Sequence, residues 1–205
     1  SRNENFVAFV DEIADTLAGS DARTLEDALQ VKKGDMTIEE FVKSKVIELG
    51  ENMQLRKFER FDLADNGAIA QYIHMGGKVG VLVEVGAGQG DTAAKEEFRD
   101  LVKDITLHIA AAAPQGLSRD DIPAELVEKE KDVYRAQMQE EGKPAEIIEK
   151  IIMGKIGKFF AESCLLEQAF VKDPDQKVGK LVESTGKTIG DELVIRRFVR
   201  FGLGE

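Results

Sequence analysis

The feature that most constrains this chain is an internal repeat of two elements that recur in the same order. The segment 3–13 (Asn-Glu-Asn-Phe-Val-Ala-Phe-Val-Asp-Glu-Ile) is echoed by 95–105 (Lys-Glu-Glu-Phe-Arg-Asp-Leu-Val-Lys-Asp-Ile), at an offset of 92 residues. The segment 50–61 is echoed by 190–201 at an offset of 140, with five identities in twelve positions. The order is kept while the spacing grows by 140 − 92 = 48 residues. We therefore interpret the chain as a duplicated architecture with an insertion in its second copy.

The repeated elements differ in their periodicity. Apolar residues recur three and four positions apart in 6–17 and in 98–109, which predicts one buried face of a helix. The segments 53–61 and 193–201 alternate apolar and polar residues, which predicts a strand with one half-polar face. Each copy is thus expected to contain a helix followed later by a strand.

The second copy also contains a strand signal before its helix. The run 79–85, Val-Gly-Val-Leu-Val-Glu-Val, is rich in β-branched residues, which favour strands. The first copy has no room for an equivalent, and the chain begins with Ser1 rather than Met. We therefore expect a strand and loop upstream of Ser1, and a natural start that is missing here. We interpret Leu63 to Met75 as a polar crossover between the copies.

The insertion has the pattern of two antiparallel helices. An acidic helix start follows Pro123, a stop lies at Gly142-Lys-Pro144, and a strong apolar stripe runs through 147–160. The predicted fold class is α+β, with two related subdomains that each combine a small antiparallel sheet with helices. The first spans 1–70, and the second spans 71–205 with a coiled-coil-like helical hairpin at about 122–162.

Composition excludes several classes of function. The formal net charge is −11, which repels phosphate backbones and argues against general nucleic-acid binding. The single cysteine, Cys164, cannot form an internal disulfide, and the sequence contains neither a signal-like segment nor a long apolar run. We expect a cytoplasmic protein that does not bind membranes.

The sharpest enzymatic signal is a strand that runs into spaced glycines, 83–91. Such turns bind nucleotides or S-adenosylmethionine in some folds, but a turn between strand and helix needs only the backbone freedom of glycine. His74 and His108 lack the spacing and the cysteines of a zinc site. No serine or cysteine lies in a nucleophile motif. We expect no metal, no cofactor and no catalytic residue, with a structural role for His108.

Two segments are candidates for contact with a partner. His74 lies in 72–77, a connector that we expect to be exposed. Phe170, Val171 and Lys172 end an apolar, aperiodic segment before Pro174. Core packing is the plain explanation of that segment, and an exposed anchor for a partner protein is the alternative.

Several phrases resemble the elongation factor Ts family. They begin at Ser1 (Ser-Arg-Asn-Glu-Asn-Phe), Gly77 (Gly-Lys-Val-Gly-Val-Leu-Val-Glu), Thr106 (Thr-Leu-His-Ile-Ala-Ala), Glu141 (Glu-Gly-Lys-Pro) and Leu165 (Leu-Leu-Glu-Gln). Glu-Lys-Glu at 128–130 belongs to the same set. The resemblance covers essentially the whole chain. It implies two related α+β subdomains with a helical hairpin in the second, the layout that the repeat predicts.

The resemblance implies a guanine-nucleotide exchange factor for the GTPase elongation factor Tu, which acts by protein binding rather than as an enzyme. It implies His74, Val171 and Lys172 as partner contacts, beside Phe170. The alternative is a structural homodimerisation module, and an S-adenosylmethionine-dependent methyltransferase is a distant one. The family's Thr-Asp-Phe-Val motif immediately precedes the residues that match Ser1. We therefore expect this chain to bind elongation factor Tu. We expect it to exchange the GDP of elongation factor Tu much more slowly than a longer chain that starts upstream of Ser1.

Overall fold

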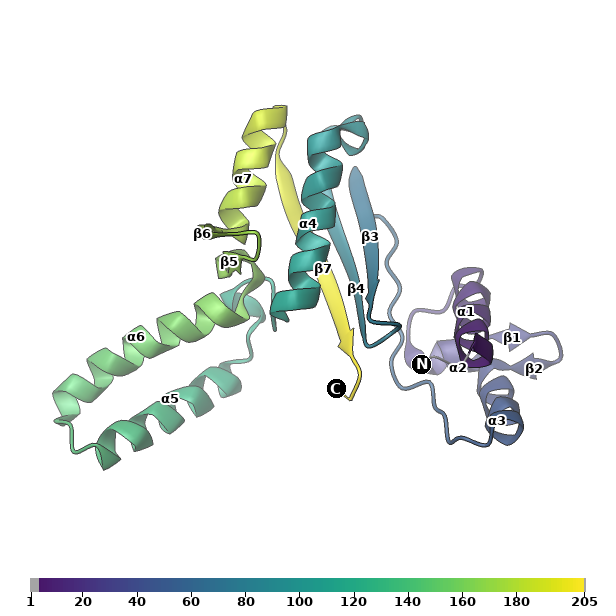
Figure 1. Cartoon of the computed structure of the whole chain (residues 1–205), viewed down its shortest axis with the longest axis horizontal. Coiled ribbons are helices and arrows are strands. Elements are labelled where there is room, and N and C mark those ends of the chain that lie inside the picture. The colour runs from purple at the N-terminus through teal and green to yellow at the C-terminus, as the bar shows by residue number, and fades with distance from the viewer. Residues whose placement is uncertain (1–3, 205) are drawn as a thin grey trace. The chain divides into compact units, whose positions relative to one another are not determined.

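The structure, a computed structural model, describes residues 4–204, with the side chain of Leu49 excepted. It confirms the predicted α+β class, because helices alternate with small antiparallel sheets (Figure 1). The chain divides into two compact units, one formed by residues up to Asp62 with Gly76–Lys78 and the other by Leu63–Met75 with 79–205. The boundary near residue 70 that the repeat suggests falls inside a strand, and the extent of the duplicated copies stays a prediction.

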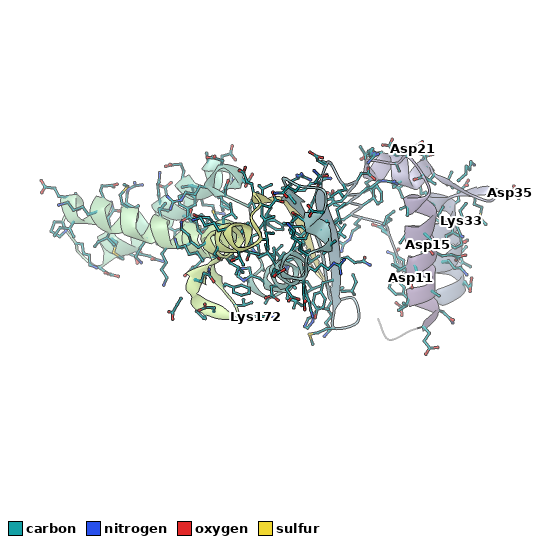
Figure 2. All side chains as sticks on the ribbon, turned by 90° about the horizontal axis from the view of Figure 1, so that it is seen from above. Asp11, Asp15, Asp21, Lys33, Asp35 and Lys172 are labelled. Atoms are coloured by element: carbon teal, nitrogen blue, oxygen red, sulfur yellow. The ribbon has the colours of Figure 1, made fainter. Side chains whose placement is uncertain are left out.

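The first unit is mainly helical. It contains α1 (Glu4–Ala18), α2 (Leu25–Gln30), the two-residue strands β1 (Lys32–Lys33) and β2 (Met36–Thr37), and α3 (Ile38–Leu49). Thr24 and Thr37 begin α2 and α3 with capping boxes, in which side chains satisfy amides that have no partner within the helix. The apolar face of α1 packs against α3 to form the core, whose buried members are Phe9, Ile13, Leu17, Ala22, Ala28, Ile38, Phe41 and Val42. Asp11 and Asp15 are exposed on α1 (Figure 2).

The strand predicted for 53–61 is wrong for this structure. Residues 51–64 have no helix or strand assignment, although Met53, Leu55 and Phe58 pack on the core of the first unit. A strand is defined by its ladder of hydrogen bonds to a neighbour. No strand among residues 4–204 pairs with this segment, so the alternating pattern does not lead to a strand here.

The second unit is built on one antiparallel sheet. Its strands are β3 (Gly67–His74), β4 (Val79–Ala87) and β7 (Leu193–Gly202), in the order β3-β4-β7. The predicted strands at 79–85 and 193–201 are thus confirmed. β4 is the central strand, and its β-branched side chains are largely buried. The pairing of β7 with β4 has a register shift between Glu84 and Val85.

The polar crossover predicted for Leu63 to Met75 is wrong, because most of it forms β3. The pairing with β4 runs without a register shift from Gly67 opposite Gly86 to His74 opposite Val79. Gly76 and Gly77 have positive φ, a conformation that glycine adopts at little cost and that suits a tight turn between strands. The small residues Ala68 and Ala70 carried no strong strand signal, and the partner strand decides their conformation.

Two helices cover one face of the sheet (Figure 1). α4 (Glu96–Ala112) lies on β3 and β4, and α7 (Val178–Ile189) packs on α4 and β7. The core between them is formed by buried side chains from β4, β7, α4, α7 and the segment before α7: Val81, Val83, Val85, Ala87, Phe98, Leu101, Val102, Ile105, Ile109, Leu165, Phe170, Val178, Val182 and Ile195.

The insertion forms the predicted helical hairpin, with α5 (Ala124–Glu140) and α6 (Ala145–Ser163). Its own core contains Met138, Ile148, Ile152 and Ile156. Beyond it lie β5 (Ala169–Phe170) and β6 (Asp173–Lys177), which pair as a short hairpin. Single 3-10 turns occupy Thr92–Ala94, Arg119–Asp121 and Leu165–Glu167.

Candidate protein-binding surface

His108 organises the region where the short β5–β6 hairpin meets α4. Its ring is fully buried, its Nδ1 accepts a hydrogen bond from the Val171 backbone N–H at 3.2 Å, and its Nε2 lies 2.9 Å from Gln168 Oε1. Because an amide N–H donates to Nδ1, the proton of the neutral ring is on Nε2, which donates to Gln168. Burial lowers the pKa of His108, against the opposing effect of the Gln168 hydrogen bond. The structural role predicted for this histidine agrees with its position.

Gln168 holds His108 in this orientation. Its amide group donates to the backbone oxygens of Ala112 at 3.3 Å and of Glu162 at 2.6 Å, at the ends of α4 and α6. Gln168 as a whole is 5% exposed, so its polar groups have partners at a place where water has little access. The β5–β6 hairpin is therefore fixed to α4 by directed hydrogen bonds as well as by apolar packing.

The three candidate residues on this hairpin have different environments. Phe170 is buried in the main core, with its ring centroid 6.0 Å from that of His108, and its side chain acts in packing here. Val171 is 46% exposed, and the Lys172 amine lies 2.6 Å from Asp104 Oδ1 on α4. Figure 2 shows Lys172 at the outer tip of the hairpin. Val171, Lys172 and Asp104 form what we call the tip surface.

His74 lies elsewhere on the same unit, at the end of β3. Its side chain is exposed. A hydrogen bond of 2.7 Å joins its Nδ1 to the Tyr72 hydroxyl, and the tautomer of the ring decides which of the two donates. The residue that follows, Met75, has φ of 49° and is 65% exposed at the β3–β4 turn. Among the described residues, no hydrogen bond, ion pair or ring contact joins His74 to the tip surface. The two candidates therefore define two patches.

Sequence reasoning missed Asp104 and Gln168. Asp104 is half-buried on α4, and the apolar pattern describes only the buried face of that helix. Gln168 belongs to the phrase Leu-Leu-Glu-Gln, but its hydrogen bonds join the ends of α4 and α6, which are far apart in sequence. The only signal available was a polar residue within an apolar segment, which indicates a buried hydrogen-bonding group.

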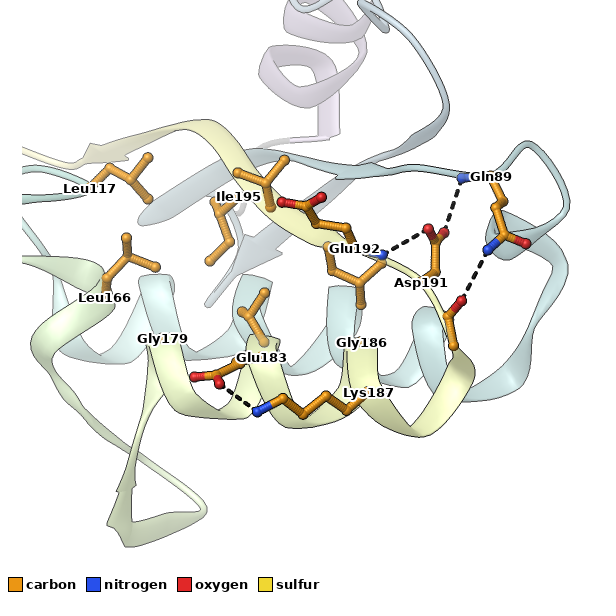
Figure 3. A pocket seen from close by; sticks show the side chains of 14 residues that line it. Gln89, Leu117, Leu166, Gly179, Glu183, Gly186, Lys187, Asp191, Glu192 and Ile195 are labelled. Atoms are coloured by element: carbon orange, nitrogen blue, oxygen red, sulfur yellow. Dashed lines mark hydrogen bonds and ion pairs between the residues drawn. The ribbon is translucent and has the colours of Figure 1, made fainter.

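Two amides of the glycine-rich turn after β4 donate hydrogen bonds within the protein. The N–H of Gly88 donates to Glu192 O at 3.1 Å, and that of Gln89 donates to Asp191 Oδ2 at 3.1 Å (Figure 3). A Cβ at Gly88 would lie 2.6 Å from Asp191 Oδ1. Glycine is thus needed at position 88 because the carboxylate approaches the backbone closely, and the amides of Gly88 and Gln89 already donate within the protein instead of to a phosphate.

A groove of about 820 Å³ lies between α7 and β7 near this turn (Figure 3). Leu117, Leu166 and Ile195 line one part of it, and an ion pair between Glu183 and Lys187 lies at its rim. Among residues 4–204, no group of three or more histidine, cysteine or acidic side chains is placed to hold a metal ion. None of the helices described is long and apolar enough to span a membrane.

The second unit presents a helical hairpin and exposed apolar side chains at Val171 and Met75, and exposed apolar surface is a feature of sites that bind other proteins. Comparison with known families makes the class specific. The family model for Elongation factor TS matches residues 1–205. This chain belongs to the elongation factor Ts family, and its role is that of an elongation factor in protein biosynthesis.

Individual relatives agree with this assignment. The chain is 41% identical to Elongation factor Ts of Trichlorobacter lovleyi and 47% identical to that of Syntrophotalea carbinolica, over its whole length and 67% of each relative. It is 42% identical to Elongation factor Ts of Clostridium perfringens over 99% of its length and 66% of the relative. The chain thus spans about two thirds of the length of the relatives it matches.

Proposed function

We propose that the chain binds elongation factor Tu and promotes the release of GDP from it during polypeptide elongation. The observation that carries this proposal is the match of residues 1–205 to the elongation factor Ts family. The action requires binding only, without bond chemistry in the exchange factor, and no cofactor or nucleic acid takes part. The place of action is the cytoplasm, where translation occurs.

The physical basis of exchange is differential binding. A protein that binds the nucleotide-free state of a GTPase more tightly than the GDP-bound state lowers the affinity for GDP by the same factor. A hundredfold preference corresponds to about 2.7 kcal/mol of coupling free energy. A few well-placed contacts are sufficient, because a small number of residues carries most of the energy of a protein interface.

Within the chain, we assign part of the binding to the tip surface and to His74. Val171 offers an exposed apolar side chain whose backbone is held by His108, so little conformational entropy is lost when a partner covers it. Lys172 forms an ion pair with Asp104 at this exposed tip, and such surface charges affect the association rate and the specificity more than the affinity. Phe170 supports the tip from within the core.

The test is binding and exchange with purified elongation factor Tu loaded with a fluorescent GDP analogue. We expect Val171→Asp to weaken binding by about tenfold or more, which is about 1.4 kcal/mol, because the carboxylate must be desolvated in an apolar contact. The matched control is Val133→Asp on α5, a valine with similar exposure of 43%. We expect this control to bind as the unchanged chain does.

Light scattering of the chain alone and with elongation factor Tu separates exchange from the homodimerisation alternative. A one-to-one complex with elongation factor Tu and faster GDP release support the proposal. Self-association of the chain, without a complex with elongation factor Tu, would contradict the exchange function and support the homodimerisation module. Equal binding by Val171→Asp and the unchanged chain would remove the tip surface from the proposal while leaving the exchange function intact.

A further inference from the structure

The strand β3 presents an open and unprotected edge. It is the outer strand of its sheet, and no strand among residues 4–204 pairs with its other side. Exposed edges in soluble proteins are usually blunted by charged residues, proline or a bulge. β3 has none of these devices, since its eight residues are Gly-Ala-Ile-Ala-Gln-Tyr-Ile-His and its pairing with β4 is regular. The opposite edge, β7, contains three arginines and a register shift.

The register determines which backbone groups of β3 face outward. The N–H of Ala87 donates to Asn66 O, and antiparallel pairs alternate between hydrogen-bonded and non-bonded positions. The even-numbered residues of β3 therefore bond to β4. The odd-numbered residues Ile69, Gln71 and Ile73 direct their N–H and C=O groups to the open edge. These groups are a template for one more strand.

A groove of about 300 Å³ lies beside this edge, between β3 and α4. Its apolar part is formed by Ala68, Ala70, Phe98 and Val102, with Tyr72 and Leu107 toward one end. The small alanines leave the space that a larger side chain would fill. An added strand would therefore have side chains on one face that enter the groove, and side chains on the other face that lie beside Ile69 and Ile73, of which Ile73 is 62% exposed.

The rim of the groove is basic. Arg99 and Lys103 belong to its lining and are exposed on α4. The Arg99 side chain donates to the backbone oxygen of Ala93, and neither cation forms an ion pair with the described residues. One helical turn separates them, about 6 Å along the axis. Side chains at alternate positions of a strand are about 6.6 Å apart, so two carboxylates on one face of a strand match this spacing.

We propose that β3 and the groove beside α4 receive an extended segment of another protein as a fourth strand, in which acidic residues alternate with apolar ones. Its carboxylates face Arg99 and Lys103, and their methylene groups cover Ala70 and Val102. Its apolar side chains lie beside Ile69 and Ile73 on the other face. This inference needs neither the exchange activity nor the tip surface.

The positive charges of Arg99 and Lys103 favour the acidic segment over a second copy of the chain as the occupant. If two β3 edges paired antiparallel about a twofold axis, both α4 helices would lie on the same face of the joined sheet. Arg99 and Lys103 of one copy would then approach those of the other. Like charges at close range disfavour the pairing, whereas a segment with carboxylates at alternate positions neutralises both.

The test uses a fluorescein-labelled octapeptide of alternating valine and glutamate, with a lysine-for-glutamate peptide as its control. We expect saturable binding of the glutamate peptide in fluorescence anisotropy and at least tenfold weaker binding of the lysine peptide. In hydrogen exchange, we expect the amides of Ile69, Gln71 and Ile73 to become protected. An absence of saturable binding, or equal binding of both peptides, would overturn the proposal.

Two variants separate the backbone from the charges. Gln71→Pro removes an outward N–H while leaving the bonds to β4, as edge strands tolerate, and should weaken binding at least tenfold, whereas Gln71→Thr should not. The double variant Arg99→Glu with Lys103→Glu should reverse the preference toward the lysine peptide, which a loss of folding cannot produce. Unchanged preference in the double variant, or a dimer through β3 in sedimentation of the unchanged chain, would refute the acidic segment as the occupant.

Discussion

At the scale of single residues, buried polar groups with several partners determine the local geometry. Glu84 is 1% exposed on β4 and accepts hydrogen bonds from Arg196 at 3.0 Å, Arg197 at 2.7 Å and the Ala64 N–H at 3.0 Å. Burial alone would raise the pKa of Glu84, but these three interactions outweigh it and lower the pKa. The carboxylate thus fixes the segment that enters β3 to the sheet.

His108 gives the second unit a specific pH dependence. Its folded-state pKa is lowered by burial, while an unfolded histidine titrates near about 6.5. The folded state therefore binds fewer protons than the unfolded state, so stability is present above about pH 6.5 and falls as the pH drops below that value. Protonation of Nδ1 also removes the acceptor of the Val171 N–H.

The matched variant is His108→Asn, whose side-chain oxygen can accept from Val171 but does not titrate. Urea unfolding at pH 7.5 and 5.5 measures the free energy of unfolding of both proteins. We expect the unchanged chain to lose about 1 kcal/mol more than His108→Asn between these pH values, since one pKa unit corresponds to about 1.4 kcal/mol. An equal loss of unfolding free energy in the two proteins would show that protonation of His108 does not destabilise the folded state.

At the scale of elements, the helical hairpin has a thin core of its own. Ile152 on α6 is 2% exposed, whereas its neighbour Met153 is 74% exposed. Lys155 lies over the Tyr134 ring at 4.9 Å, and Arg135 on α5 pairs with Glu149 on α6. Exposed ion pairs contribute little to stability, so the apolar stripe holds the two helices together.

Ile152→Ala should therefore destabilise the hairpin by about 2–5 kcal/mol, the cost of a large-to-small change in a core. Met153→Ala removes a side chain of similar size from the adjacent position and should change stability by less than about 0.5 kcal/mol. Hydrogen exchange of α5 and α6 measures both. Similar exchange in the two variants would contradict the assignment of Ile152 to the helix–helix core.

At the scale of the whole molecule, each unit has its own hydrophobic core. Ile38 is fully buried in the first and Ile105 in the second. Compact units of one chain can open separately, with their own free energies. A core mutation in one unit is therefore expected to act within that unit, as Ile152→Ala is expected to act within the helical hairpin.

We expect Ile38→Ala to speed amide exchange in α1 and α3, and Ile105→Ala to speed it in α4 and β4. Each change should cost about 2–5 kcal/mol within its own unit. Hydrogen exchange with mass spectrometry resolves the two regions. A uniform loss of protection over both units in either variant would show that they unfold as one.

Features that need pairing between distant segments depend on the folded structure. The patterns of 53–61 and 193–201 are alike, yet only the second became a strand, because β4 is beside it and no strand pairs with the first among the described residues. β3 formed from a segment without a strong signal for the same reason. The hydrogen bonds of His108 with Gln168 and Val171 depend on packing between elements, which the order of residues does not specify.

The elements with local signals follow from the sequence alone. Helix periodicity predicted α1, α4, α5 and α6, and β-branched or alternating residues predicted β4 and β7, because the 3.6- and 2-residue repeats follow from backbone geometry. The repeat also aligned Gly50 with Gly190, and both end a helix in the left-handed conformation. The family resemblance came from sequence as well, whereas the tip surface and the open β3 edge exist only where the folded chain brings separate segments together.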